Sequence, residues 1–147
     1  MLTFWVGASI DLPLGMHRNS VAHFEIYADN PDSLSAFYTT LFDWKIEPAS
    51  GMDYRMVETV DVGHDGRPTS TGGINGGIAK RPAGYPVNGS VNYVMVDSIE
   101  KTTAKARSLG AKVTKEKMPV PGMGWFAMFM DPEGNHFAIW TPDKNAK

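Results

Sequence analysis

The stretch that decides the fold is VAHFEIYAD, residues 21–29, because the chain presents the same pattern again as GSVNYVMVD at 89–97. Both runs are strand-like, both end in Asp, and both are followed by a helix-like segment of similar length. The first helix is expected in PDSLSAFYTTLF, where apolar residues recur at helical spacing after a polar start. The second is expected in SIEKTTAKARSLG, with Gly110 as its stop.

The segments after the two helices also match one another. Each half continues with an extended run, WKIEP or AKVTKE, and then a strand that begins Gly-Met-x-aromatic, GMDYRMVETV at 51–60 or GMGWFAMFM at 122–130. A last strand follows in GGINGGIAK in the first half and in HFAIW in the second. Because the same order of features occurs twice, we predict an internal duplication in which each half reads strand, helix and three strands.

This pattern predicts an α+β fold of two βαβββ modules whose curved mixed sheets surround a central cavity. The expected organisation is an N-terminal arm at 1–18, module one at 19–80, a Pro- and Gly-rich linker at 81–88, module two at 89–142 and a polar tail at 143–147. A length of 147 residues fits one domain assembled from two small halves.

Composition narrows the classes of function. The formal net charge is −2 and the basic residues are scattered, so neither nucleic acid nor a membrane surface is an expected partner. The apolar start of the arm is interrupted by Asp11 and Pro13, well short of a membrane-spanning length. The absence of cysteine excludes disulfides and thiol nucleophiles, and it favours a cytoplasmic location.

Strand alternation assigns side chains to the expected cavity. In the first strand Phe24 and Ile26 would pack under the helix, so the other alternating positions would face the enclosed space: His23, Glu25 and Tyr27. The matching positions of the second copy are Val91, Tyr93 and Met95.

The chain resembles the vicinal oxygen chelate superfamily, which includes glyoxalase I, bleomycin-resistance proteins and extradiol dioxygenases. The residues that carry the resemblance are VAHFEIYADNPDSLSAFYTTLFDWKI, with Phe-Tyr fourteen and fifteen positions after His23, and the ending DPEGNHFAIWTP. The resemblance extends over residues 19–142. It implies the duplicated fold described above and a small-molecule ligand.

Metal-binding members of that superfamily take one ligand from the first strand and one from the last strand of each half. His23 occupies the first of these positions, but Val91 and Ala138 occupy the two in the second half. In GGINGGI only Asn75 offers a side-chain donor, and the register there is open. A catalytic zinc keeps at least three protein ligands, so we expect no cofactor, with His23 as a remnant ligand. A weakly bound divalent metal is the alternative.

His23 and Glu25 are the candidate catalytic pair. Positions i and i+2 share one face of a strand within about 7 Å, and a carboxylate near an imidazole would raise the histidine pKa and fix its tautomer. The competing interpretations are a remnant metal ligand or a histidine with a purely structural role.

Candidate substrate-binding residues are aromatic, flexible or polar side chains expected on the same space: Tyr27, Asn75, Tyr93, Met95, Trp125, His136 and Trp140. A pocket of this kind suits a flat or aliphatic ligand, although the same aromatic residues also suit a core. His136 shares a face with Ala138 and Trp140 by alternation, and it is alternatively an exposed residue after a turn.

Two functions remain open from sequence. The first is a glyoxalase-like enzyme that transfers a proton beside a carbonyl, as an isomerase or lyase, with His23 or Glu25 as base and Tyr93 or His136 as acid. The second is a non-catalytic protein that sequesters a hydrophobic or aromatic compound, as bleomycin-resistance proteins do. A homodimer is expected in either case.

Overall fold

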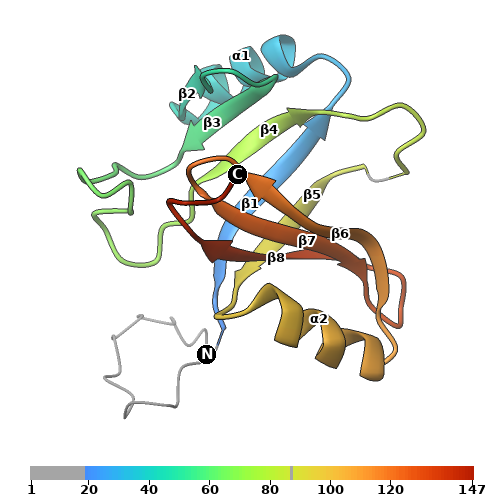
Figure 1. Ribbon diagram of the computed structural model, residues 1–147. Coiled ribbons are helices and arrows are strands. Elements are labelled where there is room, and N and C mark those ends of the chain that lie inside the picture. The colour runs from blue at the N-terminus through green and yellow to red at the C-terminus, as the bar shows by residue number, and fades with distance from the viewer. Residues whose placement is uncertain (1–18, 87) are drawn as a thin grey trace, which may run out of the picture.

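The computed structural model describes residues 19–86 and 88–147, so the expected arm at 1–18 lies outside the described residues. The two expected modules are both present (Figure 1). Module one comprises β1 (Val21–Ala28), α1 (Pro31–Phe42), β2 (Lys45–Pro48), β3 (Tyr54–Glu58) and β4 (Gly76–Lys80). Module two comprises β5 (Ser90–Met95), α2 (Ile99–Ser108), β6 (Lys112–Val120), β7 (Gly124–Met130) and β8 (His136–Pro142). The prediction of a duplicated α+β fold is therefore confirmed.

The strands form one open, mixed eight-stranded sheet in the order β2-β3-β4-β1-β5-β8-β7-β6. The two modules meet in the middle, where β1 and β5 pair antiparallel. On either side the last strand of a module pairs parallel with its first strand, β4 with β1 and β8 with β5. The order is therefore symmetric about the β1–β5 pair, and each strand of module one has an equivalent strand in module two.

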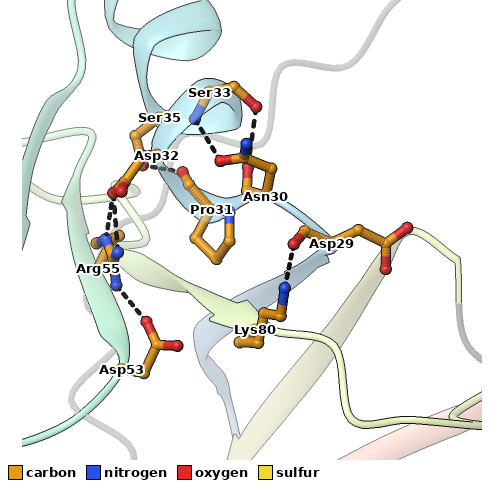
Figure 2. Close-up of polar contacts among 9 residues, drawn as sticks. All are labelled: Asp29, Asn30, Pro31, Asp32, Ser33, Ser35, Asp53, Arg55 and Lys80. Atoms are coloured by element: carbon orange, nitrogen blue, oxygen red, sulfur yellow. Dashed lines mark hydrogen bonds and ion pairs between the residues drawn. The ribbon is translucent and has the colours of Figure 1, made fainter.

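The first helix begins and ends at identifiable residues. The side chain of Asn30 accepts a hydrogen bond from the Ser33 backbone N–H at 3.1 Å, and Pro31 occupies the first turn. The helix ends at Asp43, which adopts a left-handed conformation with φ of 57°. In Figure 2 the guanidinium group of Arg55 in β3 donates hydrogen bonds to the carboxylate of Asp32 in the first turn of α1. It also donates a hydrogen bond to Asp53. These contacts fix the start of α1 against the sheet.

The second helix follows the same logic. Ser98 accepts a hydrogen bond from the Lys101 backbone N–H at 3.2 Å, and Gly110 has the positive φ of 93° that a helix stop requires. Ile99 and Thr103 are buried against the sheet. Lys105 and Arg107 lie in the last turn, where their positive charges interact favourably with the helix dipole and stabilise the helix.

The two helices lie on the outer sides of the two halves (Figure 1), and we call the sheet face that packs against them the outer face. Under α1 a cluster forms around Val57 and Ile78 with Phe24 and Ile26 of β1, as strand alternation predicts. Under α2 the cluster contains Ile99, Ala127, Phe129 and Ile139. A third cluster lies on the opposite, inner face, and its buried members are Tyr27, Val91, Tyr93, Met128 and Ala138.

The last residues pack onto the molecule. The carbonyl of Ala146, which is only 3% exposed, accepts a hydrogen bond from the Gly122 backbone N–H at 2.9 Å. The Asp143 backbone N–H donates to the Met123 carbonyl at 2.8 Å. The segment expected to be a polar tail therefore closes over the turn between β6 and β7. Across the described ranges, neither helix has the length and apolar character needed to cross a membrane.

Candidate functional site

The candidate site lies on the inner face at the junction of the two modules. Alternation along β1 turns Glu25 and Tyr27 to the same face as His23, as predicted. Across the β1–β5 pair, His23 lies opposite Tyr93 and Glu25 lies opposite Val91. The structure therefore brings the predicted pair and two of the predicted binding residues into one patch.

Glu25 is the centre of this patch. Its Oε1 accepts a hydrogen bond from the Tyr93 hydroxyl at 3.0 Å. Burial raises the pKa of Glu25 above its ordinary value of 4.5, and the hydroxyls of Tyr93, Tyr27 and Tyr54 act in the opposite direction. We refer to the five residues His23, Glu25, Tyr27, Tyr54 and Tyr93 as the polar cluster.

The three phenols of the polar cluster serve as hydrogen-bond donors. Burial raises the pKa of Tyr27, Tyr54 and Tyr93 well above the ordinary value of 10, and the charge of Glu25 raises each further. A phenol with such a pKa stays protonated at neutral pH, so it offers its O–H to Glu25 or to an oxygen of a ligand.

His23 differs from its prediction. Its Nε2 lies 2.8 Å from the Tyr54 hydroxyl, and its ring meets the Tyr93 ring edge-on at 5.3 Å between centroids. Burial lowers the pKa of His23 to about 4. The expectation that Glu25 would raise this pKa is wrong, because desolvation of the buried imidazole lowers it. His23 is therefore neutral at physiological pH.

Tyr54 is the member of the polar cluster that the sequence analysis missed. Its ring lies against Gly77 of β4, where an added Cβ atom would stand only 1.7 Å from the phenol oxygen. Gly77 pairs with Glu25 across the parallel β1–β4 ladder. The absence of a side chain at Gly77 thus creates the space through which Tyr54 reaches His23 and Glu25. The signal available in the sequence was a glycine inside an expected strand, because such a glycine often marks a place where another group approaches the backbone closely.

The strand pairing settles which residues hold the four positions where metal-binding relatives carry ligands. Tyr93 pairs with Ala138 as Glu25 pairs with Gly77, so Gly77, and not Asn75, is the equivalent of Ala138. The four positions are His23, Gly77, Val91 and Ala138. Three of them have no donor atom, and a zinc, iron or manganese site needs at least three ligands. These residues do not fit a conventional metal site.

The other predicted binding residues separate into two groups. Trp140 packs on the inner-face cluster, and His136 lies 6.1 Å from Tyr85, which packs on the same cluster. Met95 follows Tyr93 on that face but is 39% exposed, at the edge of the site.

Two predicted binding residues lie away from the polar cluster. Trp125 packs on the outer face, where its indole N–H donates to Asp143 at 2.9 Å and the Lys117 ammonium lies 4.3 Å from the ring centroid. The expectation that Trp125 faces the enclosed space is wrong, because alternation along β7 turns it to the same face as Ala127 and Phe129.

Asn75 is the second of these residues, and its side chain forms hydrogen bonds with the backbone. Its Oδ1 accepts from the backbone N–H groups of Thr59 and Val60, and its Nδ2 donates to the Val60 carbonyl at 3.0 Å. The amide therefore ties the start of β4 to the residues that follow β3, away from the polar cluster.

An open groove of about 470 Å³ lies between the end of β1 and the start of α1. It reaches Tyr27 but no other member of the polar cluster. On the inner face, Tyr27, Val91, Tyr93, Met128 and Ala138 form a buried cluster, against which Tyr85, Phe126 and Trp140 pack.

The fold and the inner-face site place the protein in the vicinal oxygen chelate superfamily. More narrowly, residues 23–140 match the model of the glyoxalase-like domain family, and the chain belongs to that family.

Two relatives and two solved structures illustrate the likeness. The chain is 31% identical over 121 residues to the Mycobacterium tuberculosis protein named "Putative glyoxylase CFP32", covering 80% of this chain and 42% of that one. It is 28% identical over 134 residues to the anthracycline biosynthesis protein DnrV of Streptomyces peucetius, covering 81% and 46%. The chain therefore spans less than half the length of these curated relatives.

Among solved structures, Streptomyces coelicolor methylmalonyl-CoA epimerase superposes with a TM-score of 0.59 at 16% identity, covering 84% of this chain and 97% of that one. A glyoxalase/bleomycin resistance protein/dioxygenase superfamily member from Vibrio splendidus gives a TM-score of 0.56 at 11% identity, covering 84% and 99%. These likenesses establish the fold alone.

Proposed function

We propose that the protein is a glyoxalase-like enzyme that transfers a proton at a carbon atom next to a carbonyl group, with Glu25 as the base. The observation that carries this proposal is a carboxyl group buried among three phenols at the junction of the modules. A base works best when its pKa lies near the working pH, and burial moves the pKa of Glu25 in that direction.

The polar cluster contains both groups that such a proton transfer needs, a base and a hydrogen-bond donor. Glu25 takes the proton from the carbon, and the bonding electron pair moves onto the carbonyl oxygen. A phenol of the polar cluster, Tyr93 or Tyr27, donates a hydrogen bond to that oxygen as its negative charge develops. With an α-hydroxy carbonyl compound, Glu25 then returns the proton to the former carbonyl carbon while the hydroxyl proton passes to the former carbonyl oxygen, which completes an isomerisation. Return of the proton to the same carbon regenerates the substrate and is detected as exchange with solvent.

His23 has a supporting role in this scheme. A histidine with a pKa of about 4 is a weak base at neutral pH, and its Nε2 is already bonded to Tyr54. We therefore assign it to holding Tyr54 in place beside Glu25. Of the two bases that the sequence allowed, Glu25 is the one that this geometry supports.

The comparisons support the reaction class in outline. One structural neighbour is an epimerase of methylmalonyl-CoA, and one relative is named as a glyoxylase. Both names describe proteins that act on carbonyl compounds. Since the chain spans less than half of its curated relatives, its own substrate is a matter for experiment.

The test is exchange of a carbon-bound proton with solvent deuterium, followed by NMR. The probes are methylmalonyl-CoA and the hemithioacetal of methylglyoxal with glutathione, each incubated in D₂O with the wild-type protein and with Glu25→Gln. The proposal expects deuterium in at least one probe with the wild type and none above background with Glu25→Gln. Exchange that is equal in both proteins, or absent with both probes, contradicts it.

Non-catalytic binding is the second candidate function. Gly77, Val91 and Ala138 replace ligand positions with small or apolar residues, and Val91 and Ala138 are both 0% exposed. A surface of this kind suits sequestration of an aromatic compound as well as turnover. Saturable binding of such a compound without any exchange of its protons would favour this candidate.

A further inference from the structure

Two polar atoms on the inner face are buried and have no hydrogen-bond partner among the described residues: the Tyr85 hydroxyl and Nδ1 of His136. Buried polar groups in folded proteins are nearly always paired, and an unpaired one costs about 1–3 kcal/mol. The two rings are neighbours, 6.1 Å apart between centroids and inclined at 60°. Because the two rings are neighbours, we refer to Tyr85 and His136 together as the polar spot.

The spot lies on the same face as the polar cluster. Tyr85 comes from the linker between the modules, where its backbone N–H closes a turn onto the Pro82 carbonyl at 3.0 Å. Its ring lies 4.9 Å from the ring of Tyr27. Tyr85 therefore reaches over the sheet from outside it and covers the end of the polar cluster.

His136 reaches the spot from the sheet. The parallel β5–β8 pairing starts with Asn92 opposite Phe137, so His136 stands one residue before it, level with Val91. Val91 in turn pairs with Glu25. His136 is thus two strands from Glu25 along one row, a distance of roughly 10 Å at ordinary strand spacing.

The surroundings of the spot define the group that it would bind. The inner-face cluster that Tyr85 joins is made of aromatic and apolar side chains, and the Glu25 carboxyl group bonded to its member Tyr93 disfavours an anionic ligand. A carbonyl oxygen is neutral, and its two lone pairs accept from the Tyr85 O–H and from an Nδ1–H of His136 at the same time. A flat aromatic body beside that oxygen would lie against Tyr27 and Trp140.

We propose that Tyr85 and His136 form a ligand subsite that binds the carbonyl oxygen of an aromatic ketone or aldehyde. The inference extends the proposed function, because it places part of the ligand one row away from Glu25 on the same face. It assigns to the linker a binding role that its Pro- and Gly-rich sequence did not indicate.

The experiment compares two bicyclic probes that differ only in the carbonyl group, 1-tetralone and tetralin. Binding is followed by chemical-shift changes in NMR spectra of the full chain. Wild-type protein is expected to prefer tetralone by about tenfold, which corresponds to one additional good polar contact. Tyr85→Phe and His136→Phe are each expected to remove that preference.

A second readout separates binding from a structural role. Both variants delete an unpaired buried polar group, so their melting temperatures are expected to rise or stay unchanged while tetralone affinity falls. The matched control is Tyr38→Phe, since Tyr38 stacks on Trp44 on the outer face. That variant is expected to keep the preference for tetralone.

The outcomes are distinct from those of the proposed function. Glu25→Gln is expected to keep the tetralone preference even though it abolishes proton exchange, so a failure of catalysis leaves the subsite intact. Equal affinity of the wild type for both probes overturns the proposal. So does a preference that survives in Tyr85→Phe and His136→Phe, or an absence of tetralone binding up to its solubility limit.

Discussion

Glu25 and Tyr93 occupy equivalent positions in the two modules, and they are bonded to one another, with the Tyr93 hydroxyl 3.0 Å from Oε1 of Glu25. The equivalence follows from the pairing, in which Glu25 lies beside Gly77 and Tyr93 beside Ala138. The duplicated scaffold thus presents a carboxyl group from one half and a phenol from the other at its centre. The asymmetry of this pair supplies a base and a hydrogen-bond donor for proton transfer.

Glu25→Gln is predicted to lower the rate of proton exchange by roughly 10²–10⁴-fold, the usual contribution of a general base. Glutamine keeps the shape of the side chain and an oxygen that accepts from Tyr93, so the fold is expected to remain intact. The measurement is the deuterium incorporation described above, with the amide NMR spectrum as a control for folding. A rate within a few-fold of the wild type would remove Glu25 from the mechanism.

Tyr93→Phe is predicted to move the acidic limb of the pH–rate profile to higher pH. The Tyr93 hydroxyl bonds to the ionised carboxylate and lowers its pKa, against the larger effect of burial, so losing that bond raises the pKa of Glu25 further. Exchange requires ionised Glu25, and the rate therefore falls off at a higher pH than in the wild type. Tyr38→Phe serves as the control; a limb that stays in place in Tyr93→Phe contradicts the assignment.

Gly77→Ala is predicted to destabilise the protein by about 1–3 kcal/mol, the usual cost of overpacking. The new Cβ atom would stand 1.7 Å from the Tyr54 phenol oxygen, so the ring has to leave His23. Denaturant unfolding measures the cost. In a Tyr54→Ala background the same glycine substitution is expected to cost little, because the clashing ring is gone. Equal costs in both backgrounds would show that Tyr54 does not need Gly77.

Asn75→Ala is predicted to destabilise the protein without weakening ligand binding. The substitution removes hydrogen bonds to the backbone of Thr59 and Val60, each of which contributes about 0.5–1.5 kcal/mol. Chemical denaturation and the tetralone titration measure the two effects separately. Reduced tetralone affinity at unchanged stability would instead restore Asn75 as a binding residue.

The fold could be predicted from the sequence because the helical spacing of apolar residues in the helices and the alternation of side chains along the strands are both clear. The helix expected in PDSLSAFYTTLF coincides with Pro31–Phe42, and alternation in β1 correctly turned Phe24 outward and His23 inward. The inner-face position expected for Trp125 is the exception, since alternation along β7 puts it with Ala127 and Phe129 on the outer face. The alternation of side chains along a strand is thus sufficient to assign its residues to the two faces of the sheet.

Contacts across strands could not be predicted in the same way. Alternation shows which residues share a face, but the reach of Tyr54 over Gly77 depends on strand register, which nothing in the local sequence fixes. The pKa of His23 depended in turn on that contact and on burial. The side-chain partners of the polar cluster became known only with the pairing of β1, β4 and β5.

The most direct test of the account is the pKa of the Glu25 carboxyl group, measured by ¹³C NMR titration and assigned by comparison with Glu25→Gln. Burial among three phenols predicts a titration midpoint above the ordinary value of 4.5. A carboxyl group that titrates at or below 4.5 would be a well-solvated or purely structural acid, and it would contradict the proposal that Glu25 is the base.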